Sequence, residues 1–284
     1  MGSFSILNNI SGVNAQNQLN INNVNLSRTL MRLSSGKRIN SGADDAAGLQ
    51  IADSLRANTA ALDQAVRNAN DGIGVCQIAD GSLQEITNLL TRAVTLAEEA
   101  STETVDQTGR NSLDAEFTSI KSEISRIASQ TAFNGYAIFT AGSGVDGKLD
   151  VFVGDISAAA ASSSIGVTID SISATSIGGA NISDDSLADT ATAQTSLTEI
   201  KSAIDGISTM RATIGAGMNR LQSAVAVLQT QSQNTQAAES VIRDANFAQE
   251  VASLTKFQIL AQSGMAALAQ ANSSSQSVLS LLRG

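Results

Sequence analysis

The chain has 284 residues, 42% of them hydrophobic, with no proline, no histidine, one cysteine and only 3% aromatic residues. Its net charge of −9 argues against nucleic acid as a partner, because phosphate binding requires a basic face. The absence of histidine excludes Ser-His-Asp triads and His-ligated zinc, and one cysteine cannot form an internal disulfide. We expect thin helical bundles, whose narrow seams need small and medium side chains, and no catalytic residue, cofactor or metal.

The first residues, MGSFSILNN, lack the basic region and the long apolar region of a cleavable secretory signal. No apolar run reaches the roughly 18 residues of a transmembrane helix, so we expect no membrane insertion. By itself this favours the cytoplasm, although some exported proteins carry no cleaved signal.

A first helix is predicted over residues 4–33, where many asparagines dilute a stripe formed by Leu19, Leu26, Leu30 and Leu33. The stretch RLSSGKRINSGADDAAGL (32–49) follows it. This stretch lacks the G-x-x-x-x-G-K-[ST] order of a phosphate loop, and no strand precedes it. We therefore predict a connector between two modules, whose charged residues are Lys37, Arg38, Asp44 and Asp45. The two aspartates suit the first turn of the next helix, through its macrodipole.

A long helix is predicted over residues 49–100, because apolar residues recur there at every seventh position: Leu55, Leu62, Ala69, Cys76, Leu83, Leu90 and Ala97. Val66, Ile73 and Val94 occupy the +4 positions of the same repeat, which Asp80 and Thr87 interrupt. Such a helix would run on the order of 75 Å at 1.5 Å per residue. Since Cys76 falls on this seam, we interpret it as a buried small hydrophobe rather than as a nucleophile.

After TETVDQTGRN (102–111), a shorter helix is predicted from the 4-3-4-3 spacing of Leu113, Phe117, Ile120, Ile124 and Ile127, with Asn111 or Ser112 as its cap. Three β-rich runs follow, at 136–139, 148–154 and 164–170, and they predict a hairpin or a three-stranded element. The motif GSGVDG (142–147) lies between two of these runs, so we interpret it as a hairpin turn rather than a dinucleotide site. The runs 156–164 and 172–185 are typical of surface loops.

A further long helix is predicted from apolar residues at 197–228, with Arg211 as the one interruption: Leu197, Ile200, Ile204, Ile207, Ile214, Met218, Leu221, Val225 and Leu228. The polar run TQSQNTQ (230–236) predicts a second break, at a distance from the chain end that mirrors the first connector. Two such breaks indicate two stacked modules, each built from both chain ends.

The final predicted helix, 246–283, carries apolar stripes on two neighbouring faces, more than the first helix alone can cover. The surplus predicts contacts with other copies of the chain. We assign subunit packing to eight of its residues: Val251, Leu254, Phe257, Leu260, Met265, Leu268, Leu279 and Leu282.

Four segments, present at both ends and in the expected order, resemble bacterial flagellin: NLSRTLMRLSSGKRINSGADDAAGLQIADSLR (25–56), QTAFNG (130–135), QILAQSGMAALAQAN (258–272) and SVLSLLRG (277–284). The resemblance implies a mostly α fold: an elongated antiparallel helical bundle from both chain ends, with a small β-hairpin mid-chain. It implies an inner module (1–43 and 237–284), an outer helical bundle (44–140 and 187–236) and a β-hairpin and variable loop segment (141–186). The variable outer domains of many flagellins are almost absent.

The resemblance further implies a non-enzymatic, self-assembling subunit of a hollow extracellular filament, exported without a cleaved signal peptide. Its implied partners are other copies, an export chaperone, and the filament cap and hook-junction proteins. Arg92, Leu96 and Glu116 match a patch that Toll-like receptor 5 reads in many flagellins, although Ile120 stands where some relatives carry a basic residue. Two alternatives are a hook–filament junction protein and a catalytic or binding module grafted into residues 140–187, a segment poor in acid–base residues.

Overall fold

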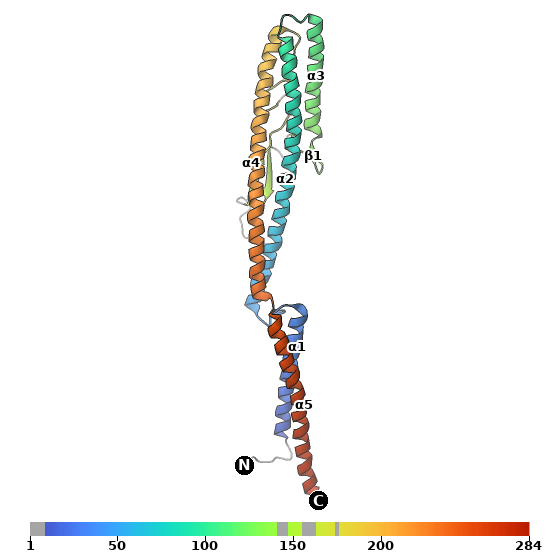
Figure 1. The fold of residues 1–284 in the computed structure, drawn as a ribbon, viewed down its shortest axis with the longest axis vertical. Helices are drawn as coiled ribbons and strands as arrows, with labels where there is room; N and C mark the ends of the chain where they lie inside the picture. The colour runs from blue at the N-terminus through green and yellow to red at the C-terminus, as the bar shows by residue number, and fades with distance from the viewer. Residues whose placement is uncertain (1–8, 141–146, 155–162, 174–175, 284) are drawn as a thin grey trace. The chain divides into compact units, whose positions relative to one another are not determined.

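The computed structural model describes residues 9–140, 147–154, 163–173 and 176–283, and of residues 275 and 278–283 only the backbone. In chain order the elements are α1 (Ile10–Ser35), α2 (Ala46–Ala100), α3 (Gln107–Gln130), β1 (Ala132–Phe133), β2 (Tyr136–Ala137), β3 (Lys148–Phe152), β4 (Ser164–Thr168), α4 (Thr190–Arg243) and α5 (Phe247–Arg283) (Figure 1). The prediction of a mostly helical fold with a small β element is confirmed. The chain divides into unit 1, formed by Met1–Ala57 and Asn234–Gly284, and unit 2, formed by Asn58–Gln233.

Unit 1 is a pair of helices from the two chain ends, α1 and α5, lying side by side. The Asn9 side chain caps α1, because its Oδ1 accepts a hydrogen bond from the Gly12 amide at 2.9 Å. Its Nδ2 donates to the Ala271 carbonyl of α5 at 3.3 Å. Leu19 of α1 lies against Gly264 of α5. The first helix therefore pairs with the last one, as the sequence predicts.

Unit 2 packs α2, α3 and α4 around a large hydrophobic core, and a smaller cluster of Leu62, Ala65 and Leu228 lies between α2 and α4. The predicted seven-residue seam of α2 is buried from Leu62 to Ala97, Cys76 included. The predicted second stripe, formed by the +4 residues Val66, Ile73 and Val94, is half-buried and packs against this core, but it is not the most deeply buried one. The buried second positions instead fall at +3 and are mostly small: Ala65, Gly72, Ala79, Ile86, Ala93 and Ala100. α2 has neighbours on several sides, so its buried face is wider than a two-helix seam, and small side chains let those neighbours approach.

Two of the three predicted interruptions, Asp80 and Arg211, prove to be partners, whereas Thr87 donates to the Leu83 carbonyl of its own helix. Arg211 of α4 donates through Nε to Asp80 Oδ1 of α2 at 2.8 Å and through Nη1 to Gln84 Oε1 at 2.6 Å. Ser232 of α4 donates to Asp63 Oδ1 at 2.8 Å. These pairs show that α2 and α4 run antiparallel, because α4 residue numbers rise as α2 numbers fall.

The start of α3 differs from the prediction. Asp106, not Asn111 or Ser112, is the N-cap, and its carboxylate accepts from the Gly109 amide at 2.8 Å. An ionised carboxylate at this position both satisfies a free amide and interacts favourably with the helix dipole. The helix therefore begins several residues before the apolar spacing that predicted it.

The helix break predicted at 230–236 is wrong, because α4 continues through that stretch as far as Arg243. The boundary between the two units, at Gln233 and Asn234, does fall within the predicted stretch. Glutamine, threonine and serine are tolerated in a helix interior. The polar run therefore marks a less buried part of α4, and the chain break lies at residues 244–246.

The β-rich runs form two separate two-stranded antiparallel sheets rather than one three-stranded element. In β1–β2 the turn is made by Asn134 and Gly135, both with positive φ, the conformation that a tight hairpin needs. The predicted strand at 136–139 ends at Ala137. Residues 142–146 of the predicted GSGVDG turn lie outside the described residues.

The β3–β4 sheet docks on unit 2 through glycines. A Cβ added at Gly72 of α2 would lie 2.6 Å from a methyl of Val151, and one added at Gly217 of α4 would lie 2.6 Å from a methyl of Val167. Beyond the strands, the Val153 amide donates to the Ser163 carbonyl at 2.8 Å. The two ends of the connecting segment are thus held together.

Residues 169–173 and 176–188, here called the strap, are not the surface loop that their composition predicts. Ile172, Ile177, Ile182 and Leu187 are buried in the core of unit 2. The strap packs tightly against α4 at Gly206, where an added Cβ would lie 2.5 Å from Gly178 Cα. Its isoleucines are spaced by five residues, a period of neither helix nor strand, so periodicity does not reveal their burial.

Candidate functional surfaces

The connector between α1 and α2 lies against the break between α4 and α5, within unit 1. Gly36 ends α1 with φ +69°, a left-handed conformation that favours glycine. The Arg38 amide donates to the Arg243 carbonyl at 2.7 Å, and the Ala245 amide donates to the Gly36 carbonyl at 2.9 Å. Main-chain hydrogen bonds therefore link the α1–α2 connector directly to the break between α4 and α5.

The four charged connector residues have different tasks. Lys37 pairs with Asp244 as an isolated β-bridge, and the Arg38 guanidinium donates to the Ile242 carbonyl at 2.7 Å. Asp45 accepts from the Gly48 amide at 2.9 Å at the start of α2. The structure therefore brings Lys37 and Arg38 to the break after α4, while Asp45 fixes where α2 begins.

Asp44 organises the remaining charges of the connector. Its Oδ2 accepts from the Asn40 and Ser41 amides at 3.3 and 3.2 Å, and its Oδ1 lies 3.8 Å from Arg32 Nη2 and 3.9 Å from Arg28 Nε. Loss of hydration raises the pKa of Asp44, but these amides, the Ser41 hydroxyl and Arg32 together outweigh it and hold the pKa below its ordinary value. The connector is thus built around an ionised carboxylate.

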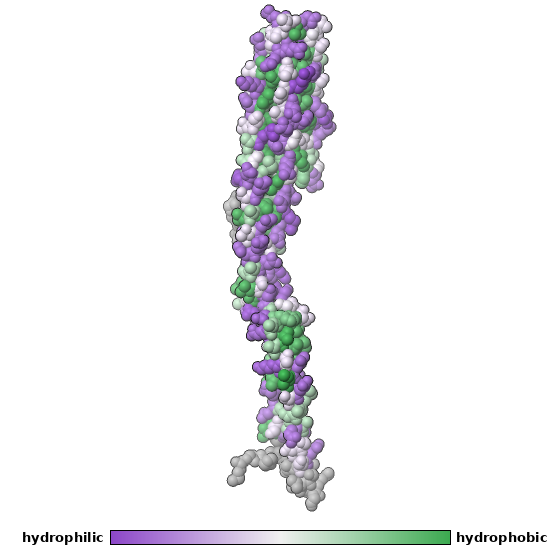
Figure 2. Space-filling model, in the orientation of Figure 1, coloured by the Kyte–Doolittle hydropathy of each residue, from purple (hydrophilic) through white to green (hydrophobic). Residues whose placement is uncertain are grey.

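Unit 1 buries very little apolar surface of its own. Among its described residues, the only buried hydrophobic ones are Ile39 and Ala52, while Asn22 and Thr29 are buried polar residues. Large apolar side chains are instead exposed along both helices: Ile10, Val13, Ile21, Val24, Leu30, Met31, Phe247, Val251, Ile259, Leu260 and Met265. Hydrophobic surface accordingly shows over this helix pair in Figure 2.

The predicted subunit-packing residues fall on this surface to different degrees. Met265 is 55% exposed, Leu260 38% and Val251 37%, whereas Leu254, Phe257 and Leu268 are half-buried against the neighbouring helix. The side chains of Leu279 and Leu282 lie outside the described residues. Contiguous exposed apolar surface of this kind is typical of an interaction face.

The predicted receptor patch divides into an exposed part and a buried part. Arg92 donates through Nε to Glu116 Oε1 at 2.8 Å, and this ion pair between α2 and α3 is about half exposed on both sides. Leu96 is only 1% exposed and Ile120 is also buried, so both belong to the core beneath the pair. An outside partner would therefore meet the two charges, with Leu96 fixing the helix that carries Arg92.

A network tying the strap to α3 was not evident from the sequence. Lys121 Nζ donates to the carbonyls of Ser183 and Asp185 at 3.2 and 2.7 Å. Asp185 Oδ2 is buried without a hydrogen-bond partner among the described residues. Burial raises the pKa of Asp185, as do Glu199 and Asp184, and Lys121 opposes them.

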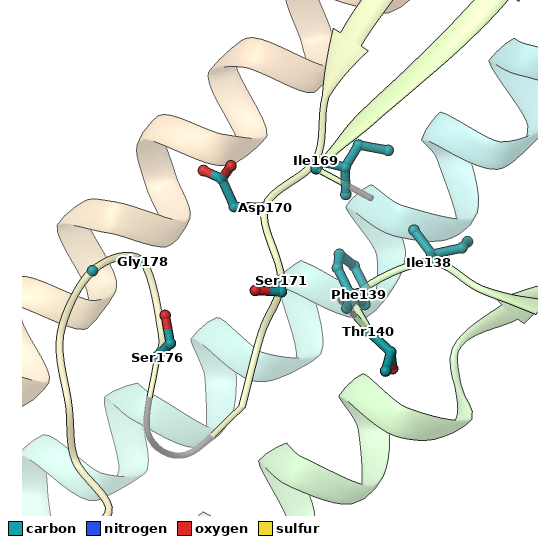
Figure 3. Close-up of a pocket in the computed structure, with 10 residues that line it drawn as sticks. Ile138, Phe139, Thr140, Ile169, Asp170, Ser171, Ser176 and Gly178 are labelled. Carbon is teal, nitrogen blue, oxygen red and sulfur yellow. The ribbon is translucent and has the colours of Figure 1, made fainter. Parts of the chain in front are cut away.

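A cavity of about 350 Å³ opens between the strap and the end of β2 (Figure 3). Ile138, Phe139 and Ile169 provide an apolar wall, while Asp170, Ser171 and Ser176 provide polar oxygens. Asp170 is the one ionisable side chain among its described lining residues. The cavity thus presents no paired acid and base in the part of the chain that the structure describes.

The described residues also lack a metal-binding cluster and a membrane-spanning helix. No cluster of three or more cysteine and acidic side chains there could hold a metal ion. No described helix combines the length and the hydropathy needed to cross a membrane.

Comparison with known proteins identifies the family. Residues 6–143 match the family model of the bacterial flagellin N-terminal helical region, and residues 197–282 match that of the C-terminal helical region. Flagellin FlaB1 of Treponema pallidum (strain Nichols) is 36% identical over 300 residues, which cover 98% of this chain and 99% of the relative. This chain belongs to the bacterial flagellin family.

Other relatives agree with this assignment. The flagellin of Bacillus subtilis (strain 168) is 36% identical, and the flagellar filament 31.3 kDa core protein of Treponema maltophilum is 34% identical, each over 98% of this chain and 99% of its own length. This flagellin is accordingly a non-enzymatic, self-assembling structural subunit of the flagellar filament.

Proposed function

We propose that the helix pair of residues 1–43 and 237–284 forms the inner, subunit-packing module of a hollow extracellular filament. Residues 44–140 and 187–236 form the outer helical bundle, and residues 141–186 add a β-hairpin and loop segment on it. The observation that carries this proposal is the apolar surface of α1 and α5, exposed on a unit whose described residues bury only Ile39 and Ala52 as hydrophobic side chains. At about 25 cal/mol per Å², burial of such side chains between copies is the main driving force available to assembly.

Removal of residues 246–284 tests the proposal, because it deletes α5 and leaves the core of unit 2 intact. We expect the full chain to pellet after seeding, while the shortened chain stays in the supernatant with a folded unit 2 by near-ultraviolet and far-ultraviolet circular dichroism. Equal pelleting of the two would contradict the proposed role of α5.

Point substitutions make the same test without deleting a helix. Leu260→Ser and Met265→Ser remove exposed apolar side chains of α5, and Gln262→Ser is a matched control at an exposed polar position of the same helix. We expect the first two to raise the protein concentration needed for filament growth and the control to leave it unchanged, as measured by sedimentation. An effect of the control as large as that of Met265→Ser would contradict the proposal.

The apolar face of α5 also supports the proposed partners before and during assembly. A subunit exported without a cleaved signal would carry this face uncovered, so an export chaperone that binds the C-terminal segment protects it from aggregation. Cap and hook-junction proteins then meet the same helices at the filament ends. We expect co-expressed chaperone to co-purify with the full chain and to be lost on removal of residues 246–284.

We also propose that the Arg92–Glu116 pair contributes to recognition by Toll-like receptor 5, supported by its exposure on α2 and α3. Arg92→Ala should weaken a receptor reporter response, whereas Arg126→Ala, which removes an exposed α3 guanidinium paired with Glu123, is the control. Equal responses to the two variants would contradict this role.

A further inference from the structure

Within unit 2, α2 presents an apolar residue and an acidic one on a single exposed stripe. Ile78 is 40% exposed, and Glu85 follows seven residues later on the same helix face. Glu85 accepts an amide hydrogen bond from Asn88 but forms no ion pair with any described residue. Between them lies Gly81, where an added Cβ would meet nothing within 4 Å. Another helix could approach this stripe closely.

The same stripe is hydrogen-bonded to Thr131, the residue that leads from α3 into the β1–β2 hairpin. The Ser82 hydroxyl donates to the Ile78 carbonyl at 3.1 Å and accepts from the Thr131 hydroxyl at 3.1 Å. Beyond Thr131, the hairpin exposes Phe133 and Tyr136. The apolar surface around Ile78 is therefore positioned by a second element.

On α4 the pattern recurs with opposite charge and opposite direction. Val227 is 64% exposed, the largest exposure of any large hydrophobic residue described in unit 2. Arg220 precedes it by seven residues, is exposed, and has no ion-pair partner among the described residues. The small residues Ser223 and Ala224 lie between them. Glycine and valine have low helix propensity, so Gly81 of α2 and Val227 of α4 are unfavourable on a solvated helix face. Exposed apolar positions of this kind favour a contact with another molecule.

We propose that, in the filament to which this flagellin belongs, Ile78 and Glu85 of one copy contact Val227 and Arg220 of a second copy. The equal seven-residue spacing places an apolar contact and an ion pair about 10 Å apart on both helices at once. An acidic chain of net charge −9 repels its copies, and a local pair of opposite charges offsets part of that repulsion.

The direction of the two helices fits a filament whose copies all point the same way. Matching Ile78 with Val227 and Glu85 with Arg220 requires α2 of one copy to run antiparallel to α4 of the next. α2 and α4 already run antiparallel within one copy, so two copies in the same orientation satisfy this condition. The two surfaces differ, so the contact is heterologous, which is the type that continues into an open helical polymer.

The pairing also fixes an axial displacement. Within one copy, Asp80 lies beside Arg211 and Asp63 beside Ser232, so Val227 lies near the level of α2 residue 67. Contact with Ile78 of another copy therefore shifts the two copies by about 11 residues, or roughly 17 Å along the helix axis.

Disulfide mapping in assembled filaments tests this contact. Ile78→Cys and Val227→Cys chains are mixed, polymerised and oxidised, and the crosslinked dimer is measured on a denaturing gel. Asp71→Cys, exposed one heptad earlier on α2, replaces Ile78→Cys as the register control. The native Cys76 is fully buried, and burial raises the pKa of its thiol, so the introduced thiols react selectively. We expect a dimer band several-fold stronger for positions 78 and 227 than for 71 and 227.

Charge reversal gives a second, independent measurement. Glu85→Lys or Arg220→Glu alone would place like charges opposite each other and should raise the critical concentration for assembly about three- to tenfold, and the double variant should restore it. Both side chains are exposed, so the melting curve of the monomer should stay unchanged.

The proposal is overturned if filaments form normally but the 78–227 crosslink does not exceed its control. It is also overturned if the double reversal assembles no better than the single ones. Failure of the unmodified chain to pellet would overturn filament assembly itself, and this contact with it, so the two failures are distinguishable.

Discussion

Gly206 gives the sharpest test of how the strap is packed. At this position of α4, an alanine Cβ would lie 2.5 Å from Gly178 Cα and 2.6 Å from Gly178 C, both of them backbone atoms. No flexible side chain can move aside, so either α4 or the strap must shift. Gly178 itself has φ +59°, which ties the strap to this conformation at the point of contact.

The magnitude follows from two opposing contributions. Replacing glycine by alanine in a helix interior stabilises by about 1 kcal/mol. Overpacking against fixed neighbours costs about 3 kcal/mol at the upper end of its usual range. We expect Gly206→Ala to lower the free energy of unfolding by about 2 kcal/mol, which for a domain of this size lowers Tm by about 4–8 °C.

Gly215→Ala is the matched control on the same helix, because an added Cβ there meets nothing within 4 Å. It should stabilise by about 0.5–1 kcal/mol and raise Tm by a few degrees. Thermal unfolding followed at 222 nm compares the two, and hydrogen exchange at the Ile177 and Ala180 amides, which bond to each other's carbonyls, reports on the strap directly. A Gly206→Ala protein that melts at or above the wild-type temperature, with unchanged exchange, would refute the close contact.

Three further predictions concern charged groups. The pKa of Asp185 is raised by burial and by Glu199, so ionisation of its carboxylate destabilises the folded chain once the pH rises through the ordinary aspartate range. Asp185→Asn should therefore raise Tm at pH 7, and this gain in Tm should vanish in acid. The pKa of Asp44 is lowered, so its carboxylate stabilises the fold above its unfolded-state pKa, and this stabilisation is lost as the pH falls through its folded-state pKa. Asp44→Asn should lower the protection of unit 1 amides from hydrogen exchange at neutral pH and leave it unchanged at the lowest pH. Equal effects at both pH values would contradict the lowered pKa. Asp80→Asn should cost about 0.5–1 kcal/mol in chemical denaturation, because the pair with Arg211 is one-third exposed, and a loss of several kcal/mol would show that it is far less solvated.

Periodicity predicted the long helices of this chain well, because a repeated apolar position can be satisfied only by burial on one face. It also placed Asp80 and Arg211 as interruptions. That the two meet could not be read from either helix, since the register between α2 and α4 is set by the whole core. The small residues at the +3 positions were missed because alanine and glycine contribute weakly to a hydrophobic pattern, although they decide which face packs most closely.

The misassigned segments share a different cause. Polar composition predicts a helix break at 230–236 and a surface loop at 172–185, yet one stretch continues α4 and the other buries Ile177 and Ile182. Burial of irregular backbone depends on partners far away in sequence. Here Lys121 donates to the Asp185 carbonyl of the strap, and Asp114 accepts from the Leu187 amide. The candidate surfaces followed the same rule: the connector and the α5 stripe were predictable from local charge and pattern, whereas the burial of Leu96 needed three dimensions.

The hydrogen bond from the Val153 amide to the Ser163 carbonyl holds together the two ends of the segment that connects β3 to β4. Everything inserted between those two residues begins and ends at nearly one point, so a guest domain whose own termini are neighbours would impose no stretch on its host. Enzymes or epitopes could therefore be grafted at this position, and each subunit of the filament would carry one of them.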